Sequence, residues 1–113
     1  MLKNKNNHNL GLLFENIVDK YGLEKIKTIG DAYMELGEID KAVNYYLDAA
    51  AKNQNELTSP AFLMKAGWAY ELLDKNKDAL NAFEKIKIDF PKSREARDVE
   101  KYISRAKAKL GEL

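Results

Sequence analysis

The sequence contains an internal repeat whose two copies align without a gap. The first copy reads IKTIGDAYMELGEIDKAVNYYLDAA and the second reads LMKAGWAYELLDKNKDALNAFEKIK. In this alignment Gly30 corresponds to Gly67 and Tyr46 corresponds to Phe83, so the copies lie 37 residues apart. A period of this size, with small and aromatic residues at fixed places, predicts a stacked array of helices.

Gly30 and Gly67 fall inside stretches that otherwise favour a helix. A glycine in a helix interior costs about 1 kcal/mol relative to alanine, so two glycines at equivalent places require a structural reason. We expect a partner helix to approach each glycine closely, with Tyr46 and Phe83 filling the space beside the contact. A large side chain in place of Gly67 should therefore separate its helix pair.

These spaced residues resemble the tetratricopeptide repeat (TPR), a family with a period of about 34 residues. The second copy carries the pattern as far as its closing proline, Pro91, whereas Gln54 takes that place in the first copy. The resemblance implies an all-α fold. It would be a TPR-like superhelical array of antiparallel helix pairs, with about two and a half repeats plus a C-terminal capping helix.

Local signals place the boundaries of this array. Gly37 predicts the end of the helix that carries Gly30. Ser59 predicts a helix cap with Pro60 as the first helical residue, and Ser93 predicts the cap of the last helix. Apolar residues also recur at helical spacing near the N-terminus. The prediction is a flexible leader at 1–9 and a single TPR-like domain at 10–113, divided into a leading helix at 10–21, repeats at 23–56 and 60–93, and a capping helix at 94–111.

Composition limits the chemistry that such a chain can perform. The sequence has no cysteine and a single histidine, His8, which excludes thiolate zinc sites, cysteine nucleophiles and histidine-based triads. The net charge of +1 gives no reason to expect nucleic acid or an anionic membrane as partner. The sequence shows neither a membrane span nor a signal peptide, so a cytoplasmic location is expected. We expect no catalysis, no cofactor and no metal.

A short segment, KYGLEKIKTIGDAYM at residues 20–34, also resembles class III nucleotide cyclases. That resemblance implies a helix that leads into a strand hairpin, with Asp31 as a metal ligand. A two-metal site needs a second carboxylate from an earlier strand, yet no acidic residue precedes Leu12. The apolar residues of the segment recur at helical spacing, which favours a helix. The segment could belong to a cyclase fragment, or it could mark an engineered join or a recombined gene. As a function for the chain, a fragment of a nucleotide cyclase is the less favoured interpretation.

The first helix of each pair lines the inner, concave face of a stacked array. Met64 and Trp68 lie four residues apart on such a helix, so they share a face and could anchor a peptide. Packing of Trp68 against a neighbouring helix is the alternative. The residues expected to line this partner-binding groove are Lys27, Asp31, Met34, Met64, Lys65, Trp68 and Glu71.

The sequence thus predicts a non-catalytic protein-protein interaction module that binds a peptide or a helix on its concave face. The mixed charges in the predicted groove suggest a partner that carries both signs and an apolar anchor. The alternative is a self-associating assembly module, a homo-oligomer formed through the N-terminal helix, because a short array leaves apolar surface that a second copy could cover.

Overall fold

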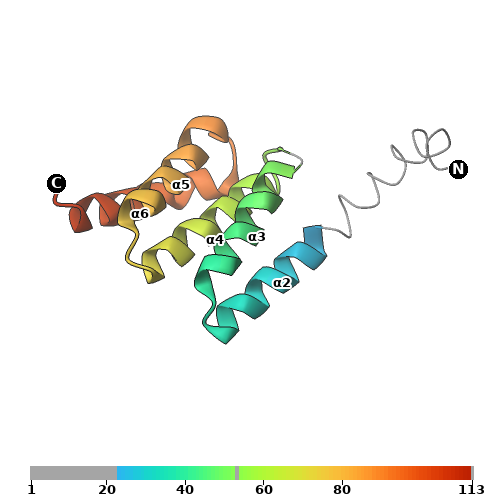
Figure 1. Ribbon diagram of the computed structural model, residues 1–113. Coiled ribbons are helices and arrows are strands. Elements are labelled where there is room, and N and C mark those ends of the chain that lie inside the picture. The colour runs from blue at the N-terminus through green and yellow to red at the C-terminus, as the bar shows by residue number, and fades with distance from the viewer. Residues whose placement is uncertain (1–22, 53, 113) are drawn as a thin grey trace, which may run out of the picture.

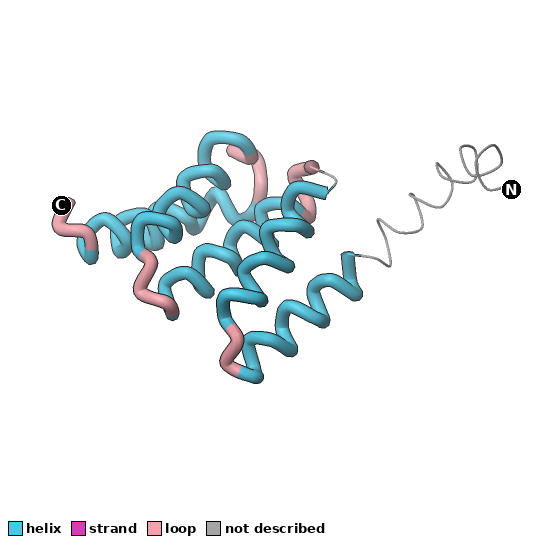
Figure 2. Tube along the Cα trace, in the orientation of Figure 1, coloured by secondary structure: helices cyan, strands magenta, loops and turns pink. Residues whose placement is uncertain are grey.

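The computed structural model describes residues 23–52 and 54–112. This part of the chain is helical, and it contains no strand (Figure 2). Its helices are α2 (Leu23–Leu36), α3 (Ile39–Lys52), α4 (Ser59–Leu72), α5 (Asn76–Asp89) and α6 (Arg94–Lys109). The predicted leader and the predicted leading helix at 10–21 lie outside the described residues.

The helices follow one another through space in the order in which they follow along the chain (Figure 1). Each helix packs against the next, and α4 also contacts α6. Short loops return the chain so that successive helices run in opposite directions, forming the pairs α2–α3 and α4–α5 before the final α6. This arrangement confirms the predicted all-α, TPR-like array for the described part of the chain.

A glycine lies under an aromatic ring in both helix pairs. A Cβ atom placed on Gly30 would lie 2.7 Å from Cε1 of Tyr46, and one placed on Gly67 would lie 2.3 Å from Cε1 of Phe83. Real Cβ atoms do not approach a ring carbon this closely. The repeated glycines therefore have the expected reason, close approach, and the group that approaches each glycine is the ring itself.

The hydrophobic core runs from α3 to α6 along the array. Phe83 and Ile86 of α5 and Val99 of α6 are the largest apolar side chains that are completely buried. Alanines at the helix contacts, among them Ala42 and Ala79, have no exposed surface and allow the helices to lie close together.

The helix termini follow the sequence signals in two places and depart from them in one. Gly37, with a φ of +80°, ends α2, and the Ser93 hydroxyl caps α6 by accepting a hydrogen bond from the Ala96 amide at 3.1 Å. Ser59 does not cap α4. It is the first residue of that helix, and its buried hydroxyl donates to the carbonyl oxygen of Ala50 at 2.8 Å. None of the described helices has the length and apolar character needed to cross a membrane.

Candidate functional site

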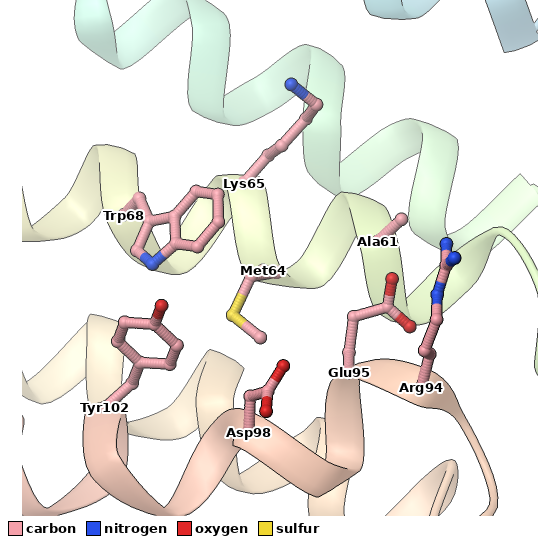
Figure 3. A pocket seen from close by; sticks show the side chains of 8 residues that line it. All are labelled: Ala61, Met64, Lys65, Trp68, Arg94, Glu95, Asp98 and Tyr102. Carbon is pink, nitrogen blue, oxygen red and sulfur yellow. The ribbon is translucent and has the colours of Figure 1, made fainter.

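An open hollow of about 310 Å³ lies between α4 and α6 (Figure 3). It lies on the face formed by first helices of the array, because α4 opens the second pair and α6 follows it. Both helices contribute four residues, and the lining consists of Ala61, Met64, Lys65, Trp68, Arg94, Glu95, Asp98 and Tyr102.

Aromatic rings form one end of the hollow. The side chain of Trp68 meets the ring of Tyr102 edge to face, with centroids 5.7 Å apart and an angle of 72° between the planes. Tyr102 in turn stacks on the buried Phe83 at 5.5 Å. Trp68 therefore packs on a neighbouring helix and still keeps 41% of its surface exposed. The two interpretations of Trp68 are compatible, since the contact with Tyr102 holds the exposed indole in place.

Met64 lies nearer the core than the sequence suggested. It is only 5% exposed and belongs to the hydrophobic core, while still contributing to the lining of the hollow. In Figure 3 its side chain extends from α4 towards α6, between the aromatic end and the carboxyl groups of α6. Met64 thus provides a buried apolar floor.

Glu71 does not line the hollow, although it was expected in the groove. Its carboxylate accepts two hydrogen bonds from Arg105, at 2.9 Å from Nε and 2.6 Å from Nη2. The Glu71 side chain is only 10% exposed, and the Arg105 guanidinium also lies 4.9 Å from the centre of the Tyr102 ring. The two hydrogen bonds between Arg105 and Glu71 join α6 to α4, and the Arg105 guanidinium supports the Tyr102 ring against which Trp68 packs.

The predicted groove residues of α2 form a separate polar cluster with Lys65. Asp31 Oδ1 accepts hydrogen bonds from the Tyr46 hydroxyl and from Lys65 Nζ at 3.4 Å, and Oδ2 accepts from Lys27 Nζ at 3.2 Å. Neither Lys27 nor Asp31 lines the hollow. Met34, the third predicted residue of α2, is half-buried against the core.

Opposing effects set the pKa values in this cluster. Burial raises the pKa of Asp31, but the Tyr46 hydrogen bond and the ammonium groups of Lys27 and Lys65 outweigh it and hold that pKa below its usual value. Burial, followed by the hydrogen bond to Asp31, raises the pKa of Tyr46. Both effects favour a carboxylate that accepts from a neutral phenol, so the cluster ties α2 to α3 and α4.

The metal ligand implied by the cyclase resemblance does not fit this geometry. Both oxygens of Asp31 already accept hydrogen bonds, and the residue lies within α2, not on a strand hairpin. Within residues 23–52 and 54–112, no group of three or more His, Cys, Asp or Glu side chains could hold a metal ion. Asp31 therefore acts as the acceptor of an interhelical cluster in this fold.

Sequence reasoning missed the α6 half of the hollow. The segment at 94–111 was expected only as a capping helix, so the four lining residues of α6 were not predicted. The spacing of the repeat gave no signal for these residues, because the alignment of the two copies ends before α6 begins.

The chain matches two protein families, each over a different range of residues. The family described as "Adenylate and Guanylate cyclase catalytic domain" matches residues 6–65, more than half of the chain. The family described as "Tetratricopeptide repeat" matches residues 61–93, which include α4 and α5. No curated protein and no solved structure matched the chain.

The cyclase match extends over residues that fold as helices. Its described part, 23–52 and 54–65, forms α2, α3 and the first half of α4. The contact of Tyr46 with Gly30 in this range has the same form as the contact of Phe83 with Gly67 in the TPR match. The first helix pair is therefore packed in the same way as the second, although the two pairs match different families.

Proposed function

We propose that this chain is a non-catalytic protein-interaction module. Over residues 6–65 the chain belongs to the adenylate and guanylate cyclase catalytic domain family, and it carries a tetratricopeptide repeat at residues 61–93. It binds a peptide or a helix of another protein in the hollow between α4 and α6. The tetratricopeptide repeat supports an interaction role, and the lining of the hollow supports the proposal that binding occurs there.

The observation that carries the proposal is the exposed indole of Trp68 at the hollow. A large aromatic side chain that is held in place by Tyr102 loses little further conformational entropy when a partner covers it. Met64 supplies apolar surface beside it. Tryptophan in such a setting is the residue type that most often dominates binding energy at protein interfaces.

The state of Asp31 supports a non-catalytic role. Metal-assisted nucleotidyl transfer needs carboxylates with free lone pairs for cations, whereas Asp31 is engaged by Tyr46, Lys27 and Lys65. We expect calorimetric titration with Mg²⁺ and ATP to give no binding heat. Binding that disappears in Asp31→Asn would contradict the proposal and favour the cyclase family's activity.

Selection from a random peptide library tests the interaction role directly. The immobilised chain should enrich peptides that lose at least about tenfold in affinity for Trp68→Ala, the effect of a hot-spot residue. Leu72→Ala is the matched control, because Leu72 is an exposed apolar residue of the same helix that does not line the hollow. Enriched peptides that bind Trp68→Ala as tightly as the unaltered chain would place the binding site elsewhere.

Self-association is the second candidate function. Leu36, Leu57, Leu72 and Ile88 are exposed large apolar side chains away from the hollow, and a second copy of the chain could cover them. Light scattering over a range of protein concentrations separates the two functions. A monomer at every concentration would leave the binding of a different protein as the function.

A further inference from the structure

The α6 side of the hollow presents two carboxylates that form no ion pair with any other described residue. Glu95 and Asp98 both line the hollow, and within the described part of the chain neither has an ion-pair partner within 4 Å. Figure 3 shows both side chains extending from α6 towards α4, with Asp98 opposite Met64. Their negative charge therefore faces the space that a bound segment would occupy.

The cations of the lining do not compensate for both carboxylates. Lys65 is directed away from Asp98 (Figure 3), and its ammonium group lies 3.4 Å from Asp31 of α2. Arg94, the first residue of α6, extends beside Ala61. With Lys65 paired to Asp31, the charged side chains left in the lining are one guanidinium and two carboxylates. The hollow favours an incoming cation over an incoming anion.

The same hollow offers apolar surface for the rest of a basic side chain. The methylenes of lysine or arginine can lie on Met64, and a cation can sit over the exposed face of Trp68. A cation that lies over an aromatic ring and also pairs with a carboxylate already occurs next to this hollow. Arg105 places its guanidinium 4.9 Å from the Tyr102 ring while its fork holds the Glu71 carboxylate.

We infer that the segment bound in this hollow is anchored by a single arginine or lysine side chain, which lies over Met64 beside Trp68 and pairs with Asp98 and Glu95. The inference rests on the proposed interaction role and names the chemistry of the partner. The partner is a protein segment with an exposed basic residue next to an apolar one.

The test uses the sole tryptophan of the sequence as its reporter. The indole N–H resonance of Trp68 is followed by NMR during titration with N-acetyl-arginine amide and, separately, with N-acetyl-citrulline amide. The two probes have nearly the same shape and differ in charge. The arginine probe should bind about fivefold more tightly, as expected for one partly exposed ion pair with a cation–π contact. Added salt should reduce this difference.

Charge-neutralising variants locate the effect. Glu95→Gln combined with Asp98→Asn should lower the affinity of the arginine probe to that of the citrulline probe. Asp48→Asn combined with Glu56→Gln is the matched control, because both residues are exposed, carry the same charges and lie outside the hollow. This control should leave the preference for arginine unchanged.

Equal affinities of the two probes, or an arginine preference that survives in Glu95→Gln with Asp98→Asn, would overturn the inference. The peptide-library selection then shows whether the interaction role fails as well or only the cationic anchor. Peptides that depend on Trp68 but show no enrichment of basic residues would leave the interaction role intact without a cationic anchor.

Discussion

The phenyl ring of Phe83 occupies the space in which any residue other than glycine at position 67 would carry its Cβ atom. The nearest ring carbon lies 2.3 Å from that position. Tyr46 and Gly30 repeat the relationship in the first helix pair, at 2.7 Å. The ring, not the helix backbone, sets how closely α4 and α5 approach.

Gly67→Ala should destabilise the fold even though alanine is the better helix former. We expect a net loss of about 1–2 kcal/mol, because the cost of overpacking, about 1–3 kcal/mol, exceeds the gain of up to about 1 kcal/mol in helix propensity. Urea denaturation measures the free energy of unfolding. Gly30→Ala should lose less than Gly67→Ala, and a more stable Gly67→Ala would contradict the ring contact.

Asp31→Asn should remove a contribution to stability that depends on pH. The pKa of Asp31 is lowered in the fold, so its contribution is present above the pKa of the unfolded chain, 3.8, and is lost as the pH falls through the lower folded value. Because the side chain is 38% exposed, the contribution should stay below about 1 kcal/mol.

The measurement compares the unfolding free energies of the unaltered chain and Asp31→Asn at neutral pH and below pH ~4. The difference should shrink towards zero in acid. Asp48→Asn controls for the loss of one negative charge at an exposed position of α3. A difference between the unaltered chain and Asp31→Asn that stays constant across this range would mean that the interhelical cluster does not stabilise the carboxylate.

The two partners of the Glu71–Arg105 pair should respond unequally to removal. The Glu71 side chain is 10% exposed and the Arg105 side chain is 47% exposed. Arg105→Met removes both hydrogen-bond donors of the largely buried Glu71 carboxylate, so it should lower the free energy of unfolding by about 1–3 kcal/mol. Glu71→Gln leaves a cation in water and should cost less. Thermal unfolding of both variants checks the order, and the reverse order would show that the pair is not held as described.

Loss of the α6 cap should weaken the fold at one end of the hollow. The Ser93 hydroxyl accepts from the Ala96 amide and donates to the Phe90 carbonyl oxygen at 2.7 Å, and the residue is buried. Ser93→Ala should therefore cost about 1–2 kcal/mol. Ser104→Ala is the control, because Ser104 is an exposed residue in the middle of the same helix. Equal effects of the two substitutions on chemical denaturation would argue against the cap.

Most of the fold could be predicted from the sequence because its determinants are local and repeated. The two glycines, their aromatic partners and the turn at Gly37 each mark a position at which only a few residue types fit. Ser59 was predicted to cap α4 with Pro60 as its first residue, whereas α4 begins one position earlier, at Ser59 itself. The buried carbonyl of Ala50 needs the Ser59 hydroxyl, and such a demand is visible only once the two helices are together.

The site was predicted less completely because it depends on residues that are distant in sequence. Met64, Lys65 and Trp68 could be assigned to one face from helical spacing. Glu71 could not be recognised as paired, since its partner Arg105 lies on a helix interpreted as a cap. No sequence signal set Asp98 and Glu95 of that helix apart from its other charged residues. Their position opposite Met64 follows from the return of α6 to the same face as α4.

The glycine-and-ring contact also determines which sequences this fold can accept. Gly30 belongs to the segment that carries the cyclase signature, yet it meets the steric requirement that Tyr46 imposes on a repeat helix. Asp31, the next residue of that segment, accepts hydrogen bonds from Tyr46 of α3 and Lys65 of α4. An array that fixes the residue type at only a few positions in each helix pair can therefore be formed by a segment whose sequence matches a different family.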